Sequence, residues 1–259
     1  MNNTRCFSFG CSYTRYYWAT WADFIGCNFD SFTNFGRAGA SNTFIMNKVF
    51  EVNEIVKFDP RTDYIVVMFT GMSRFSYISK RTKSWTTLGN IRNISKDDPD
   101  YFAISTFVDN IWNESWAIYQ TWIAVKAVKE FLTSKNLKHK ILMGIDNSYY
   151  KTNADILDLD PSDIEKIKDI YNMLDVEESL DEYVSSDRQK IYFKENNISD
   201  DHPTQISHFK YMSKYFPEFI SNKSVNLLQK AEKVFDSTSR EIQEQNYDKL
   251  RPYSYYSLN

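Results

Sequence analysis

The sequence predicts an α/β fold, a three-layer α/β/α sandwich around a mostly parallel, flavodoxin-like central sheet. Segments with strand character alternate with segments of helical periodicity, which is typical of repeated βαβ units. The segment DYIVVMF (63–69) is a continuous apolar run rich in β-branched residues, as expected for a strand that is covered on both faces. Right-handed crossovers then place helices on both faces of the sheet. With 259 residues and no internal repeat, we expect one domain.

The first half of the chain supplies the clearest elements. Apolar alternation that ends at Gly10 predicts a strand over 4–10, and period-two alternation predicts another in FDSFTNFG. Apolar residues at helical spacing after Ser41, a suitable N-cap, predict a long helix. The predicted strands are 4–10, 29–36, 63–69, 140–145 and 190–193, and the predicted helices are 18–25, 42–58, 114–134, 205–220 and 225–244.

Two segments interrupt the alternation. Residues 75–112 are polar and irregular and contain Asp-Asp-Pro, and residues 146–189 include the acidic run DVEESLDEY. A charge run of this kind is typical of a solvated helix face. We interpret both segments as insertions into a single domain of residues 1–259, which ends with a C-terminal helix and a tyrosine-rich tail over about 224–259.

Composition excludes several classes of function. The net charge of −3 and the pI near 5.7 give no reason to expect a nucleic-acid partner. Neither a signal peptide nor a membrane-spanning apolar run is present, so we expect no membrane partner and a cytoplasmic or virion-associated protein. Cys6, Cys11 and Cys27 form no zinc-binding spacing and a poor disulfide framework. We expect no metal or organic cofactor, and the sequence is silent on the oligomeric state.

Chemistry-bearing residues follow the ends of the predicted strands. Ser12 follows the first strand, glycines 36 and 39 the second, and Gly71, Ser73 and Arg74 the third. His202 follows the last predicted strand, with Asp200 two residues before it. Ligands bind beyond the carboxyl ends of strands in open parallel sheets, so these groups are expected at one edge. A hydroxyl, an imidazole and a carboxylate together suit acyl transfer.

These segments resemble the conserved blocks of the SGNH (GDSL-type) hydrolases. FGCSYT (9–14) looks like the first block, NFGRAGASN (34–42) the second, and DDHPTQISH (200–208) the closing one. FTGMSR (69–74) stands where the third block, Gly-x-Asn-Asp, would be. The resemblance covers roughly residues 5–75 and 190–220 and does not extend to the middle of the chain.

The resemblance implies a role for each matching residue. Ser12 is the implied nucleophile, His202 the base and Asp200 the acid, with Asp201 as the alternative acid, because the usual Asp-x-x-His spacing would place Ser199 there. The implied oxyanion donors are the backbone N–H groups of Ser12 and Gly39. Further predicted contacts are Ser73 to the oxyanion and Arg74, Tyr13 and Asn42 to the substrate.

Two features depart from or compete with this assignment. The third-block asparagine is replaced by Ser73 and the aspartate by Arg74, so either residue is a candidate to stabilise the anion. Losing one such donor costs about 2.7–4 kcal/mol in other enzymes, which predicts a slower enzyme rather than none. His208 is the alternative base, His139 lies in a basic stretch, and Cys11 is expected to pack at the strand end.

The function expected from this resemblance is that of a serine esterase. The aromatic cluster Tyr13, Tyr16, Tyr17 and Trp18 is consistent with a sugar-stacking wall or with helix core, and it favours carbohydrate O-deacetylation, as in phage-like members of the class. The second hypothesis is a binding or structural module, for example a phage-associated glycan-binding one, that keeps the scaffold without catalysis. A nucleotide binder is the third, although the chain has no GxGxxG or GxxxxGK[ST] motif.

Overall fold

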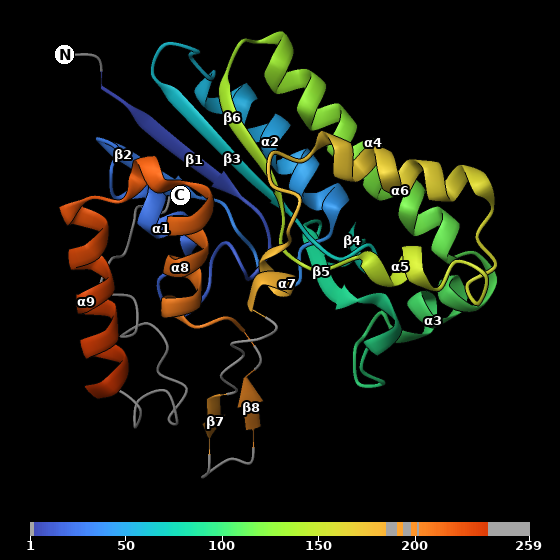
Figure 1. Cartoon of the computed structure of the whole chain (residues 1–259). Coiled ribbons are helices and arrows are strands. Elements are labelled where there is room, and N and C mark those ends of the chain that lie inside the picture. The colour runs from blue at the N-terminus through green and yellow to red at the C-terminus, as the bar shows by residue number, and fades with distance from the viewer. Residues whose placement is uncertain (1–2, 185–190, 194–197, 201, 238–259) are drawn as a thin grey trace.

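A parallel sheet forms the centre of the computed structural model, which describes residues 3–184, 191–193, 198–200 and 202–237 (Figure 1). Its described strands are β1 (Arg5–Phe9), β2 (Ser31–Asn34), β3 (Asp63–Phe69) and β6 (Lys138–Met143). They are ordered β2-β1-β3-β6, and every pairing between neighbours is parallel. The predicted fold class is therefore confirmed.

Helices cover both faces of this sheet (Figure 1). One layer contains α1 (Trp21–Gly26), α8 (Gln205–Tyr215) and α9 (Asn222–Ser237), which contact one another. The other contains α2 (Asn42–Val56), α4 (Glu114–Ser134) and α6 (Pro161–Met173), with α4 packed between the other two. The predicted cap of α2 is confirmed, because the Ser41 hydroxyl accepts a hydrogen bond from the backbone N–H of Phe44 at 3.2 Å.

The strand order creates a topological switch point between β1 and β3. These two strands are neighbours, yet the chain leaving β1 enters α1 on one face, while the chain leaving β3 leads to α4 on the other. The two connections diverge, and a crevice at the carboxyl ends of such strands is the usual ligand site in open α/β sheets.

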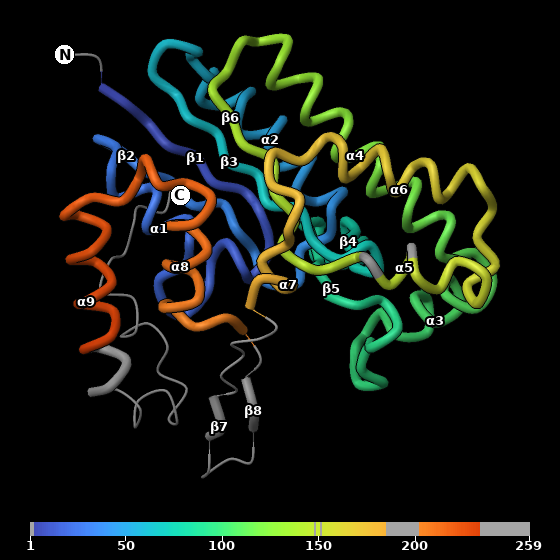
Figure 2. The backbone as a smooth tube through the Cα atoms, in the orientation of Figure 1, coloured from blue at the N-terminus to red at the C-terminus, as the bar shows by residue number. Residues whose placement is uncertain are grey.

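The two predicted insertions carry secondary structure of their own. The segment after β3 forms an antiparallel hairpin, β4 (Arg74–Ile78) and β5 (Trp85–Asn90), then η1 (Ile91–Asn93) and α3 (Tyr101–Asn110). Figure 2 shows this hairpin beyond the carboxyl ends of the central strands. The segment after β6 contains α5 (Ser148–Thr152), α6 and α7 (Leu180–Val184). Ile167 and Ile170 of α6 are fully buried, so this segment contributes to the core.

The prediction that residues 190–193 add a strand to the parallel sheet is wrong. β7 (Ile191–Phe193) pairs antiparallel with β8 (Ile198–Asp200), and this hairpin is separate from the central sheet (Figure 1). A short apolar run does not show by itself which partner it will pair with. The predicted helix 205–220 ends at Tyr215 and is followed by η2 (Pro217–Phe219), and residues 238–259 of the predicted last helix and tail lie outside the described residues.

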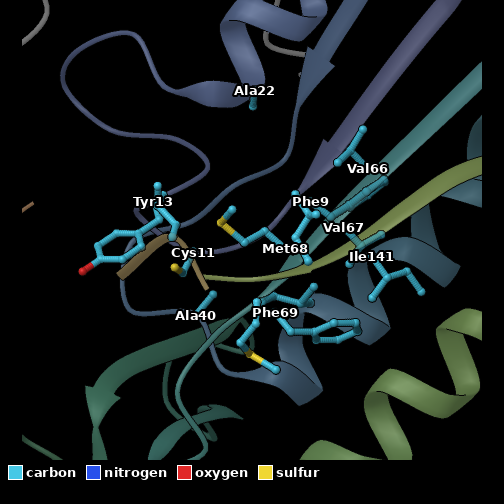
Figure 3. Packing of buried hydrophobic residues seen from close by; sticks show 14 of the residues in the cluster. Phe9, Cys11, Tyr13, Ala22, Ala40, Val66, Val67, Met68, Phe69 and Ile141 are labelled. Atoms are coloured by element: carbon cyan, nitrogen blue, oxygen red, sulfur yellow. The ribbon is translucent and has the colours of Figure 1, made fainter. Parts of the chain in front are cut away.

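The core lies where the central strands meet the two helix layers. Figure 3 shows Phe9, Val67, Met68, Phe69 and Ile141 packed around the carboxyl halves of β1, β3 and β6, and all five are fully buried. This packing fixes the strand ends from which the loops of the candidate site leave. Within the described part of the chain, every helix is too short or too polar to cross a membrane.

Candidate active site

A tight turn presents Ser12 directly after β1. The backbone N–H of Thr14 donates to the carbonyl of Cys11 at 3.0 Å, which closes the turn around Ser12. A Cβ atom at Gly10 would lie 2.0 Å from the Thr14 hydroxyl and 2.9 Å from the carbonyl oxygen of Met68, so only glycine fits there. The glycine that follows the strand therefore allows the turn to fold back over β3.

Ser12 lies at hydrogen-bond distance from His202. The Nε2 atom of His202 is 2.9 Å from the Oγ atom of Ser12, although 190 positions separate the two residues in the chain. The Ser12 side chain is buried, whereas His202 is partly exposed. An imidazole nitrogen at this distance is in position to accept the hydroxyl proton.

Three aromatic residues from the loop after β1 hold the His202 segment. The ring of Tyr16 stacks on the imidazole with centroids 3.8 Å apart and planes 15° apart. Tyr13 meets the same imidazole edge-on at 5.6 Å, and Trp18 donates its indole N–H to the carbonyl of Pro203 at 2.8 Å. The loop that carries the hydroxyl therefore also positions the base.

The other two histidines occupy different environments. His208 is buried on α8, and burial, followed by the charge of His202, lowers its pKa to about 3. His139 lies in the first half of β6, where its Nδ1 atom is 2.8 Å from the carbonyl oxygen of Leu137. Of the three histidines, His202 is therefore the one that contacts Ser12 at the carboxyl end of the sheet.

The residue that would orient the imidazole falls outside what can be described. Asp200 ends β8, but its side chain and all of Asp201 lie outside the described residues. Both remain predicted acids. Asp181 of α7 is linked to the imidazole through Tyr13, because its carboxylate accepts a hydrogen bond from the Tyr13 hydroxyl at 3.1 Å.

The second glycine-containing loop lies beside the Ser12 turn. The backbone N–H of Arg37 donates to the carbonyl of Gly10 at 3.0 Å, which joins the two loops. Gly39 has φ +72°, and a Cβ atom there would lie 3.1 Å from both the nitrogen of Gly89 and the carbonyl oxygen of Thr87. Gly39 is thus fixed against β5 in a conformation that favours glycine, while its role as an oxyanion donor stays a prediction.

Asn34 makes a second bridge between these loops, which the sequence did not suggest. Its side-chain amide donates to the carbonyl of Thr14 at 2.7 Å, and its side-chain oxygen accepts from the backbone N–H of Gly36 at 3.0 Å. One side chain at the end of β2 therefore ties the Ser12 turn to the loop that leads to Gly39.

Two predicted contact residues have structural partners. The Asn42 amide donates to the carbonyl of Thr70 and to the hydroxyl of Thr121, both at 3.0 Å, and its oxygen accepts from the N–H of Thr70 at 2.7 Å. Ser73 lies beside the Tyr150 phenol, whose pKa is raised to about 12, chiefly by burial. Their roles toward substrate stay predictions.

The remaining candidates are placed as follows. Cys11 is fully buried between Tyr13 and Ala40 (Figure 3), as expected for packing at a strand end. Arg74 begins β4 and lines a pocket beside the start of α2. Among the described residues, no group of three or more histidine, cysteine or acidic side chains is arranged to hold a metal ion.

Comparison with known proteins finds a similarity of structure rather than of sequence. No family model matches the sequence, and no curated protein sequence matches it either. A crystal structure of a member of the lipolytic protein G-D-S-L family from Veillonella parvula is similar to this chain with a TM-score of 0.43 and 11% sequence identity, over 85% of this chain and 99% of that one. The case for a chemistry therefore comes from the side chains of the site.

Proposed function

We propose that this chain is a serine ester hydrolase of the SGNH type. The observation that carries the proposal is the 2.9 Å contact between the Ser12 hydroxyl and the His202 imidazole at the switch point of the sheet. Serine is a weak nucleophile until a base accepts its proton, and this pair supplies both parts. The aromatic contacts that hold His202 support the same role, because proton transfer needs a fixed geometry.

The proposed reaction has two halves. Ser12 Oγ attacks the ester carbonyl carbon while His202 Nε2 takes the hydroxyl proton; the ester C–O bond then breaks, and the imidazolium gives that proton to the leaving alcohol. Water, deprotonated by His202, attacks the acyl-serine and releases the carboxylic acid and free Ser12. In this proposal the N–H groups of Ser12 and Gly39, with Ser73, bind the oxyanion, and Asp200 orients the imidazole.

The finer proposal is that the ester is an acetyl group on a carbohydrate. Tyr17 is 39% exposed and its ring lies 4.7 Å from the ring of Tyr16, which stacks on His202. An exposed tyrosine ring beside a hydrolytic site suits the apolar face of a sugar. The proposed partner is therefore a glycan ester, with neither nucleic acid nor membrane involved.

The test is turnover of p-nitrophenyl acetate by the wild type, Ser12→Ala and a control, Ser84→Ala, which removes an exposed hydroxyl from the β4–β5 hairpin. We expect Ser12→Ala to lose activity by on the order of 10³-fold or more and the control to keep it. A fluorophosphonate probe should label the wild type at Ser12. Equal rates for the wild type and Ser12→Ala would remove the assignment.

A binding module without catalysis is the second candidate. It is favoured by the third-block position, where Ser73 replaces an asparagine. If Ser12 stays unlabelled by the fluorophosphonate at every pH between roughly 6 and 9, this candidate replaces the hydrolase.

A further inference from the structure

A pocket of about 160 Å³ lies beside the loops of the candidate active site. Its walls come from the first residues of α2, from β4 and from the first half of α4. Side chains that line it include Asn42, Thr43, Arg74, Phe75, Trp116 and Gln120. Two segments of the lining follow predicted oxyanion donors in the chain: one comes after Gly39 and the other after Ser73. Ser12 and His202 do not line the pocket.

Arg74 gives this pocket a positive charge that no carboxylate of the described residues offsets. Its side chain is partly buried, and within the described part of the chain no carboxylate lies at ion-pair distance from it. By contrast, Arg5 pairs with Asp63, and Arg92 pairs with Glu114. The described residues that line the pocket include neither aspartate nor glutamate. Removing a guanidinium from bulk water without a counter-charge is costly, so the pocket favours an anion.

The other walls select which anion fits. Phe75 stacks on Phe107 at 5.3 Å, and Trp116 meets Phe107 edge-on at 5.8 Å, so two apolar walls are held in place by a third ring. The Asn42 amide is already bonded to Thr70 and Thr121. The other neutral polar groups of the lining are the Gln120 amide and the hydroxyls of Ser41, Thr43, Ser76 and Thr121. One cation beside apolar rings suits an organic acid better than a strongly hydrated inorganic anion.

We propose that this pocket is a binding site for the carboxylate of a small organic acid, with Arg74 as the primary ligand. The guanidinium is a planar fork that matches a carboxylate with two parallel hydrogen bonds. A cavity of roughly 150 Å³ accommodates one benzene-sized ring, so the acid has about the size of benzoate. The proposal stands on this pocket alone and does not require the hydrolase activity.

Calorimetric titration tests the proposal with three probes: benzoate, its uncharged analogue benzamide, and inorganic phosphate. The proteins are the wild type, Arg74→Gln, Arg74→Lys and a control, Arg81→Gln, which removes an exposed arginine from the same β4–β5 hairpin. We expect saturable binding of benzoate by the wild type and by Arg81→Gln. Arg74→Gln should weaken it by on the order of tenfold or more, and Arg74→Lys should restore it only partly, because a lysine lacks the fork.

The outcomes separate clearly. If benzamide binds as tightly as benzoate, charge is irrelevant to binding. If phosphate binds in preference to benzoate, the proposed ligand class is wrong. Either result overturns the proposal, as does the absence of benzoate binding to the wild type. Benzoate affinity unchanged in a folded Arg74→Gln protein would overturn it too. A benzoate-dependent rise of the wild-type melting temperature that is lost in Arg74→Gln gives a second, independent readout.

Discussion

At the scale of single residues, the imidazole of His202 is held by rings as well as by polar contacts. Tyr16 covers one face of it at 3.8 Å, and Tyr13 abuts its edge at 5.6 Å. The electron-rich face of a tyrosine favours a cation above it by about 0.5–2 kcal/mol. Tyr16 therefore favours the imidazolium form that arises when His202 takes the serine proton.

Substitution of Tyr16 tests this contact. Tyr16→Leu should lower kcat/KM several-fold with p-nitrophenyl acetate as the substrate, because the imidazolium loses the ring that stabilises it and the base loses its fixed orientation. Tyr16→Phe keeps the ring face and should follow the wild type. If the two variants lose activity equally, the ring face has no such effect.

At the scale of elements, the site depends on a loop that is fixed from two sides. The segment from Gly36 to Gly39 is bonded to the Ser12 turn through Arg37 and to β5 through the Gly39 carbonyl, which accepts from the Gly89 N–H at 3.1 Å. The β4–β5 hairpin, predicted only as an irregular insertion, is therefore a support for the predicted oxyanion loop.

Gly39 and Gly89 form a natural pair of test positions. Both have positive φ, +72° and +70°, but a Cβ atom at Gly39 meets β5 at 3.1 Å, whereas one at Gly89 meets nothing within 4 Å. Alanine at either site should cost about 1–2 kcal/mol of backbone strain. We expect Gly39→Ala to lower the free energy of unfolding further and to reduce kcat, and Gly89→Ala to reduce stability only. Denaturant unfolding and kinetics of both variants check this. If the two variants lose the same stability and the same kcat, the loop around Gly39 has no special role in activity.

The sequence predicted those elements whose pattern is local. The helix 114–134 and the strand 63–69 have the bounds expected for them, because long apolar periodicity and a continuous β-branched run identify their own type. The hairpin of β7 and β8 escaped prediction, since a three-residue strand shows no preference for a partner. Trp18 and Pro203 lie 185 positions apart, so their bond was also beyond what local patterns show. The contact of Ser12 with His202 was predicted, but the carboxyl ends of parallel strands explain only the place of Ser12, because the strand before His202 lies outside the central sheet.

At the scale of the whole molecule, the position of the base depends on the docking of α8 on α1. The helix begins just after His202 and Pro203, with Thr204 as its N-cap, and its buried face meets α1. His208 is buried on α8, and neither of its ring nitrogens has a hydrogen-bond partner among the described residues. Because the pKa of His208 is lowered to about 3, chiefly by burial, the folded protein keeps this ring neutral.

This buried histidine makes stability depend on pH. The unfolded chain binds a proton at His208 below a pH of about 6.5, whereas the folded chain resists protonation down to about 3. The stability that depends on a neutral His208 is therefore fully present above the pKa of the unfolded chain and is lost as the pH falls through this window. The free energy of unfolding then falls by up to about 1.4 kcal/mol per pH unit. His208→Leu should flatten the dependence between roughly pH 6 and pH 4, and His139→Leu, on β6, should keep the wild-type slope. Urea unfolding across this range measures the difference, and parallel curves for wild type and His208→Leu would show that the folded protein does not hold His208 neutral.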